Sequence, residues 1–391
     1  MAEVIVVGGG IIGMSVAYRL TRAGADVVLL EADRLGGGTS GSSFAWINAN
    51  NKAPFEYHRL NVAGMAEHSL LQAEFGAAPW LHLHGNVIWE DSSAGQDSTE
   101  PDVPARVDSL AEKVRRLREW GYPVQVLSAR ELLEVYPDLA VPPDVDWVAS
   151  FPNEGFVDVP QLIAVLADAT VRLGAKLHTH TKVVEIRRRG SRVVGVRTAD
   201  GEQYFADVVV SCTGRWTDEL TQLAGCQIPM APTLGLLVVS TPVVTRFRGL
   251  VHTPSVNLRP DGGSRLLMAS FEIDRKLHQS TTPEMLQQFA NQIFTRARTI
   301  LPALEGASVE SFKVGVRSIP KDAFPVVGPI KGLEGFYVIA THSGVTLGPV
   351  LGRIAAKEIL TSETDDRLEP FRPDRLIGQN TDQASSGVHP G

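Results

Sequence analysis

Cysteine is scarce in this chain of 391 residues, which has only Cys212 and Cys226. Two thiols in so long a chain argue against a secreted protein built on disulfides, and their spacing is not that of a metal-binding pair. His82 and His84 alternate as on a strand, but no third ligand lies near them. No metal site is therefore predicted.

Positive charge and long apolar runs are also lacking. The formal net charge is -7, so nucleic acid and anionic membranes are poor partners. No apolar run approaches the ~18 residues of a membrane-spanning helix. The glycine motif at Gly8 leaves no room for a signal peptide. We therefore expect a soluble cytoplasmic protein. The sequence does not set its oligomeric state, and a homo-oligomer is left open.

The first 33 residues contain a complete strand, helix and strand. Residues 4–7 are apolar and β-branched, as in a buried parallel strand. The turn Gly-Gly-Gly-Ile-Ile-Gly over 8–13 leads into a helix predicted over 14–23. A second strand over 27–30 ends at Glu31. This order is typical of a dinucleotide-binding βαβ unit.

Each glycine of this motif has a distinct role. Gly8 permits the tight turn, Gly10 lets the backbone approach a pyrophosphate, and Gly13 lets the helix pack against the strand. The helix N-terminus supplies positive potential and free N–H groups. Glu31 can accept both ribose hydroxyls and would repel a 2′-phosphate, which disfavours NADP. FAD and NAD both fit this motif.

Other parts of the chain favour FAD over NAD. A loop rich in glycine, serine and asparagine over 34–53 follows Glu31, and loops of this length usually serve a ligand. A late apolar strand over 335–340 runs into a turn at Gly344. No second Gly-x-Gly-x-x-Gly motif is present, which disfavours a reductase with two dinucleotide sites. These features suit a long ligand that reaches a second contact region near the C-terminus.

The predicted fold class is α/β, with a Rossmann-like domain interrupted by an α+β domain that carries an antiparallel sheet. The Rossmann-like pieces are 1–50, 150–228 and 318–372. The insertions 51–149 and 229–317 form the second, substrate-binding domain, and 373–391 is a flexible tail. We predict helices over 54–76, 105–120, 159–173 and 348–360, and strands over 176–188, 192–197, 206–210, 234–240 and 265–270.

Five stretches together resemble the D-amino-acid oxidase family of flavoproteins, which includes glycine oxidase and sarcosine oxidase. The first is the opening βαβ unit. The others are the small-residue loop over 37–43, the strand and glycine turn over 208–216, the Gly-Val-Arg segment over 315–328, and the turn over 342–349. The resemblance covers nearly the whole chain. Ser318 departs from it, because proline is commoner at that position.

The glycine motif and the resemblance together imply an FAD site. No cysteine lies near Arg317, where covalent sarcosine oxidases attach the flavin, so the FAD should be non-covalent. The residues expected to hold it are Gly8, Gly10, Ile11, Ile12, Gly13, Glu31, Ala32, Ser40, Ser42, Ser43, Val183, Cys212, Thr213, Gly214, Trp216, Gly344, Val345, Thr346 and Leu347.

The resemblance also implies oxidation of a small carboxylate-bearing amine. Arg317 occupies the family position that holds the carboxylate, for which a guanidinium offers two parallel charge-assisted hydrogen bonds. His342, in the late glycine turn, is a second catalytic candidate that would tune the flavin or touch the substrate. Trp46 and Asn48 are candidates for the substrate wall. Arg259 precedes a Pro-Asp-Gly turn and is expected to be solvated.

The resulting prediction is an FAD-dependent oxidase of glycine or an N-substituted glycine. Hydride would pass from Cα to flavin N5, water would convert the imine to a 2-oxo acid (glyoxylate) and an amine, and O2 would reoxidise the flavin to give H2O2. Three alternatives stay open: a D-amino-acid dehydrogenase that passes electrons to a quinone or carrier, a flavoprotein subunit without amine oxidase activity, and an NAD dehydrogenase.

Overall fold

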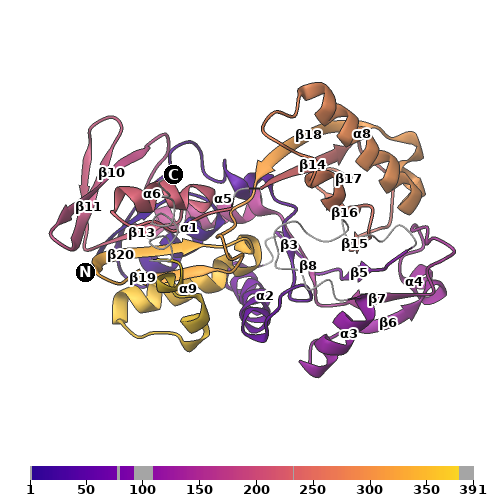
Figure 1. Ribbon diagram of the computed structural model, residues 1–391, viewed down its shortest axis with the longest axis horizontal. Coiled ribbons are helices and arrows are strands. Elements are labelled where there is room, and N and C mark those ends of the chain that lie inside the picture. The colour runs from indigo at the N-terminus through magenta and orange to yellow at the C-terminus, as the bar shows by residue number, and fades with distance from the viewer. Residues whose placement is uncertain (1, 77–79, 92–108, 232, 378–391) are drawn as a thin grey trace, which may run out of the picture.

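Two large β-sheets lie at opposite ends of the molecule, with a small sheet between them (Figure 1). The computed structural model describes residues 2–76, 80–91, 109–231 and 233–377. One large sheet has nine strands, the other has eight, and the small one has three. The sheets are joined by several passages of the chain, so residues far apart in sequence meet between them.

The nine-stranded sheet has a mostly parallel centre. Its order is β10-β11-β20-β13-β1-β2-β9, with β12 paired to β11 and β19 paired to β20. β1 pairs in parallel with both β2 and β13, which is the arrangement expected of a βαβ unit. Its strands are β1 (Glu3–Val7), β2 (Asp26–Leu30), β9 (Lys176–His178), β10 (Val183–Arg189), β11 (Arg192–Thr198), β12 (Gln203–Phe205), β13 (Val208–Ser211), β19 (Val326–Ile330) and β20 (Leu333–Ala340).

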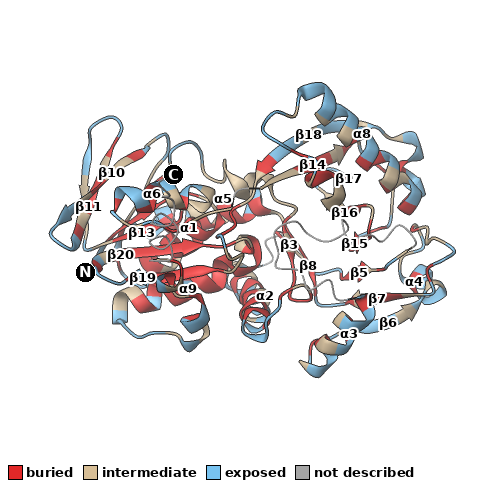
Figure 2. Cartoon of the chain, in the orientation of Figure 1, coloured by how far each residue is buried: buried red, intermediate tan, exposed pale blue. Residues whose placement is uncertain are grey.

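Both faces of this sheet are covered, which explains why its central strands are mostly apolar. Val4 and Val6 of β1 pack with helices α1 (Ile11–Arg22), α5 (Val159–Arg172) and α9 (Gly344–Thr361). Ile5 and Val7 point to the other face, where they pack with residues that include Leu220 of α6 (Thr217–Leu223). Figure 2 shows this concentration of buried residues in the central strands and the exposed tip of the β10–β11 hairpin.

The eight-stranded sheet belongs to the inserted segments. Its order is β18-β14-β17-β16-β15-β5-β7-β6, and its pairs are antiparallel apart from β15 with β5. Its strands are β5 (Asn86–Ile88), β6 (Gln125–Ser128), β7 (Trp147–Phe151), β14 (Leu234–Ser240), β15 (Leu250–His252), β16 (Asn257–Asp261), β17 (Arg265–Ala269) and β18 (Val309–Val316). The helices of this half are α3 (Leu110–Glu119), α4 (Ala129–Val135), α7 (Phe271–Asp274) and α8 (Pro283–Ile300).

The small sheet connects the two halves. Its strands β3 (Trp46–Ile47) and β4 (Leu81–His82) both pair with β8 (Gly155–Val157). Helix α2 (Phe55–Phe75) follows β3 and packs against α9. His68 of α2 hydrogen-bonds the carbonyl of Val345 in the first turn of α9 through Nε2, at 2.8 Å. This contact ties an inserted helix to the last helix of the nucleotide-binding half.

Three predicted elements need correction. The strand predicted over 176–188 is two strands, because the backbone turns at His180, which has a φ of +53°. β9 pairs in parallel with β2, whereas β10 pairs with β11. The last helix begins at Gly344, four residues before its predicted start, so the expected glycine turn is its first turn. The helix predicted over 105–120 begins at a capping box of Ser109 and Glu112. Residues 105–108 lie outside the described residues.

The predicted flexible tail is wrong for its first five residues. Leu376 is buried, and Arg375 bonds Asp322 at 2.7 Å. Residues 378–391 lie outside the described residues. The remaining division of the chain stays our proposal. Every strand of the nine-stranded sheet falls within 1–50, 150–228 or 318–372. No helix in the described part of the chain is both long and apolar enough to cross a bilayer.

Candidate functional site

A cavity of about 660 Å³ lies at the carboxyl ends of β1, β2 and β13. This edge of a parallel sheet is where nucleotide ligands bind in doubly wound folds. Most residues expected to hold FAD line it: Gly8, Gly10, Ile11, Ile12, Glu31, Ala32, Ser40, Ser43, Val183, Cys212, Thr213, Gly214, Trp216, Gly344 and Val345. We call this cavity the cofactor cleft.

Gly8 and Gly13 of the turn between β1 and α1 leave no room for side chains. Gly8 has a φ of +105°, and a Cβ there would lie 2.5 Å from the carbonyl oxygen of Cys212. A Cβ on Gly13 would lie 1.8 Å from the carbonyl oxygen of Gly8. Gly13 therefore packs the helix on the strand and does not line the cleft. The bare backbone between β1 and α1 is the cradle that a pyrophosphate requires.

The carboxylate of Glu31 is held at the rim of the cleft. Its Oε2 accepts a hydrogen bond from the backbone N–H of Gly9 at 2.6 Å, and its Oε1 accepts one from Asp33 at 2.8 Å. The small-residue loop over 37–43 contributes Ser40, whose Oγ accepts a hydrogen bond from the N–H of Ile11 at 3.0 Å. Volume, glycine cradle and acidic rim together fit a dinucleotide such as FAD.

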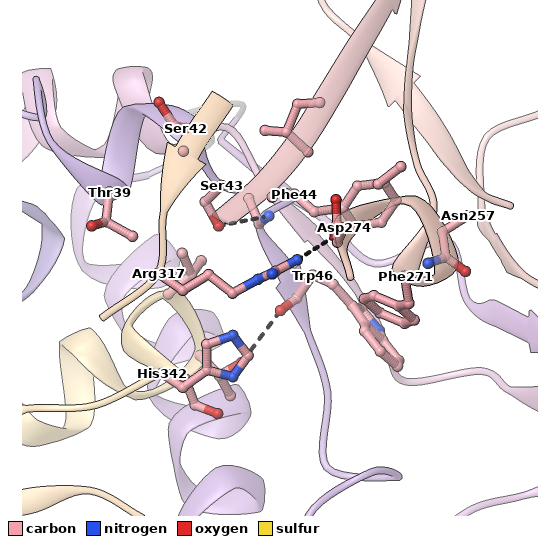
Figure 3. Close-up of a pocket in the computed structure, with 18 of the residues that line it drawn as sticks. Thr39, Ser42, Ser43, Phe44, Trp46, Asn257, Phe271, Asp274, Arg317 and His342 are labelled. Carbon is pink, nitrogen blue, oxygen red and sulfur yellow. Dashed lines mark hydrogen bonds and ion pairs between the residues drawn. The ribbon is translucent and has the colours of Figure 1, made fainter. Parts of the chain in front are cut away.

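A second cavity of about 140 Å³ adjoins the cofactor cleft (Figure 3). We call it the substrate cavity. Thr39, Ser43, His342 and Val345 line both cavities and form their shared wall. Its other walls come from the segment after β3, from β14, from α7 and from the end of β18. A molecule in this cavity would therefore lie against whatever occupies the adjoining end of the cleft.

Arg317, Trp46 and Asn48 all line the substrate cavity, as does His342. Arg317 is not free, because its guanidinium forms an ion pair with the buried Asp274 of α7 (Figure 3). Its Nη1 also donates to the carbonyl of Leu234 at 2.6 Å. Asp274 in turn accepts from the N–H of Leu236 at 2.8 Å. The charge of Arg317 is thus largely balanced by the protein.

Glu154 organises the wall that carries Trp46 and Asn48. This carboxylate is fully buried just before β8, and it accepts hydrogen bonds from Trp46 Nε1 at 3.2 Å and Tyr122 at 2.7 Å. It also accepts from the backbone of Ala49 and Asn50, and from the amides of Asn50 and Asn86. Burial raises the pKa of Glu154, and these hydrogen bonds act against that rise.

The same network reaches a histidine that the sequence did not single out. Asn86 Oδ1 lies 2.8 Å from His252 Nδ1, and the ring of His252 lies against that of Trp46 with centroids 3.9 Å apart. Both rings line the substrate cavity. Glu154 therefore fixes the position of two aromatic wall residues that are far apart in sequence.

Four expected residues lie elsewhere than predicted. Ser42 and Thr346 line the substrate cavity and not the cofactor cleft. Leu347 is fully buried in the core, and its side chain lies next to Gly64 of α2. Arg259 is buried, not solvated, because Phe44 and Phe156 cover its guanidinium and Asp261 and the carbonyl of Phe44 bond it.

Sequence reasoning missed several residues of the substrate cavity. Lys52 is the most notable, because it lines the cavity and is only 6% exposed. Asp274, Asn257 and Phe271 also line it, and they come from the second insertion. Lys52 lies in the long loop that was assigned to a ligand, and that loop was the one signal that could have found it.

A family model described as FAD dependent oxidoreductase matches residues 3–358. The chain belongs to this family. Glycine oxidase from Geobacillus kaustophilus is 27% identical over 387 residues, which cover 96% of this chain and 98% of the relative. A crystal structure of that enzyme superposes with a TM-score of 0.80 and 24% identity, and covers 97% of this chain and 100% of the other. The superposition supports the fold class predicted from the sequence.

One further relative and one further solved structure carry the names of other oxidases. The 4-methylaminobutanoate oxidase (formaldehyde-forming) of Paenarthrobacter nicotinovorans is 27% identical over 376 residues, which cover 91% of this chain and 43% of the relative. The iminodiacetate oxidase of Chelativorans sp. superposes with a TM-score of 0.77 at 20% identity, and covers 95% of this chain and 98% of the other. Family membership makes this chain an FAD-dependent oxidoreductase that acts on amino-acid or amine substrates.

Proposed function

We propose that the protein is an FAD-dependent oxidase of glycine or an N-substituted glycine. The observation that carries this proposal is the wall shared by the cofactor cleft and the substrate cavity, which includes His342 and Val345. A small cavity that borders the cleft and contains cationic side chains suits an amine with a carboxylate. Names of relatives such as glycine oxidase and iminodiacetate oxidase support this choice of substrate class.

The size of the substrate cavity limits the substrate. Its volume of about 140 Å³ is close to that of an apolar cavity that accepts benzene, so roughly six to ten non-hydrogen atoms fit. Glycine, sarcosine and short N-carboxyalkyl glycines satisfy this limit. A long or bulky amino-acid side chain does not.

Arg317 is proposed to hold the carboxylate common to these substrates. A guanidinium has five N–H donors, and Arg317 uses one for Leu234 and one for Asp274, so three remain. The pair with Asp274 fixes the plane of the guanidinium before substrate arrives. Arg317 therefore acts as an orienting residue whose position is set in advance.

Polar atoms of the cavity suit the amine end. The Oδ1 atoms of Asn48 and Asn257 are buried and have no hydrogen-bond partner among the residues that the structure describes. Buried acceptors of this kind are costly unless a ligand or water supplies a donor, and an amine N–H does so. Phe44, Trp46 and Phe271 line the same cavity and give it apolar surface.

FAD supplies the redox chemistry when bound, taking hydride from Cα to N5 and passing the electrons to O2 as H2O2. The chain's own residues orient the carboxylate and accept the amine N–H. The N-terminal end of α9 directs its positive potential at the wall shared by both cavities. Water converts the released imine to glyoxylate and an amine. We propose that the FAD is held without a covalent bond, since Cys226 does not line the cleft and Cys212 is a buried thiol whose pKa is raised by burial.

Anaerobic bleaching of the bound flavin tests this function. Purified holoprotein is mixed with glycine, sarcosine, longer N-alkyl glycines and small D- and L-amino acids, and its visible absorption is followed. Bleaching by glycine or N-alkyl glycines, reversed quickly by air, is the expected result. Slow recovery in air would point to a dehydrogenase, and a flavin that none of them bleaches would contradict the proposal.

A further inference from the structure

Lys52 is a buried cation without an anion. It lies in the loop between β3 and α2 and is 6% exposed. Across the described residues, no carboxylate lies within ion-pair distance of its Nζ. The Nζ lies over the ring of Tyr57, 5.8 Å from the ring centroid. Lysine is almost never buried in this way unless it is paired.

The backbone around Lys52 is held firmly. Glu154 accepts hydrogen bonds from the N–H groups of Ala49 and Asn50, which are three and two residues before Lys52. Tyr57, whose ring lies near the ammonium of Lys52, forms a hydrogen bond through its hydroxyl with Ser343 Oγ at 2.6 Å. The segment that leads to Lys52 is therefore anchored beside the substrate cavity.

The other buried cations of this region differ from Lys52. Arg317 has Asp274, and Arg259 has Asp261 together with two backbone carbonyls. Lys52 lines the substrate cavity and does not line the cofactor cleft, so a cofactor phosphate is not its partner. No anion among the described residues balances Lys52, and a carboxylate of a molecule in the substrate cavity would do so.

We propose that Lys52 binds a second carboxylate of the substrate, so that the preferred substrate is a dicarboxylic secondary amine such as an N-carboxyalkyl glycine. This inference rests on the proposed function, in which Arg317 holds the carboxylate next to the reacting carbon. The two cations come from different elements, one after β18 and the other after β3.

Binding of thioether analogues tests the site without turnover. Thiodiacetate carries two carboxylates and methylthioacetate carries one, and neither has an amine to oxidise. Calorimetric titration of the holoprotein should show thiodiacetate binding at least tenfold more tightly. Lys52→Met should remove that advantage and leave methylthioacetate binding unchanged, whereas Lys52→Arg should retain most of the advantage. Lys331→Met, at an exposed lysine outside both cavities, is the matched control.

Two results would overturn the site. Equal affinity of the wild type for the two analogues removes the second carboxylate site. If Lys52→Met loses affinity equally for thiodiacetate and methylthioacetate, with flavin content unchanged, Lys52 holds the carboxylate that both analogues share. The turnover of iminodiacetate, compared with that of its monoamide, N-(carbamoylmethyl)glycine, then tests whether the preferred substrate carries two carboxylates. If thiodiacetate binds through Lys52 and no N-alkyl glycine bleaches the flavin, the anion site stands and the oxidase proposal fails.

Discussion

The cofactor cleft and the substrate cavity are built in different ways. The cleft is formed mainly by backbone at the ends of neighbouring parallel strands, and its key residues lie within short motifs. The substrate cavity is formed by side chains from β3, β14, α7, β18 and the start of α9, which meet only in the folded chain. Binding of a cofactor common to a family thus depends on local sequence, whereas substrate choice depends on contacts between distant segments.

The largest effect is expected from Gly13→Ala, which should disturb the cofactor cleft and leave the substrate cavity in place. The added Cβ would lie 1.8 Å from the carbonyl of Gly8, so α1 must move away from β1. We expect loss of bound FAD and destabilisation of about 3 kcal/mol or more. Flavin absorbance after gel filtration and urea unfolding measure both. Gly262→Ala is the control, because nothing lies within 4 Å of its added Cβ. Normal flavin content in Gly13→Ala would show that the cleft tolerates backbone shifts.

Acid should weaken the wall that the two cavities share. Burial lowers the pKa of His68 to about 4, from 6.5, and His68 bonds Val345 of that wall. Between these two values the unfolded chain binds a proton that the folded chain does not. Stability is therefore lost as pH falls from about 7 to 4, by about 3 kcal/mol from this group.

His68→Gln isolates this contribution in urea unfolding curves. The variant should lose about 3 kcal/mol less than the wild type over that pH range. His180→Gln, at an exposed histidine, should follow the wild type. Identical pH profiles for all three proteins would exclude His68 as the titrating group.

Arg317→Lys should affect the substrate cavity and spare the cleft. A point charge replaces the planar fork, so carboxylate substrates lose one of two parallel hydrogen bonds. We expect kcat/KM to fall tenfold to a hundredfold, by about 1.4 to 3 kcal/mol, with full flavin content. Steady-state kinetics and flavin absorbance check this. Arg265→Lys, at an arginine paired with Glu310 outside both cavities, should change neither. An unchanged kcat/KM would remove Arg317 from the site.

Thr39→Val is expected to have the smallest effect and to act on both cavities. It removes the hydrogen bond from Thr39 Oγ1 to the carbonyl of Val316, which measures 2.8 Å. A single bond of this kind contributes about 0.5–1.5 kcal/mol. We expect a stability loss in that range, together with slightly weaker FAD and substrate binding. Thr295→Val, which removes a hydrogen bond at an exposed position of α8, should weaken the binding of neither FAD nor substrate. A change confined to one ligand would show that the cavities are independent at this point.

Prediction from the sequence succeeded where a feature is set by local rules. The close packing at Gly8 and Gly13 follows from the geometry of one βαβ turn. The strand predicted over 234–240 is found at Leu234–Ser240, and the one predicted over 206–210 is found at Val208–Ser211, because both contain apolar runs. The register of the inserted strands and the ion pair of Arg317 with Asp274 depend on long-range packing, which no local pattern encodes. Lys52 was missed for the same reason, since only burial reveals that it lacks an anion.

The contact between the small-residue loop over 37–43 and β18 limits how chimeras of this enzyme can be designed. Gly315 lies so close to Ser42 that an added Cβ would be 2.8 Å from its Cβ and from its carbonyl oxygen, and Thr39 bonds the next residue, Val316. A chimera that takes its substrate half from one parent and its nucleotide half from another would therefore bring mismatched surfaces together here. The loop and the strand must be inherited as a matched pair, although 272 positions separate Lys313 from the Gly41 carbonyl that it bonds.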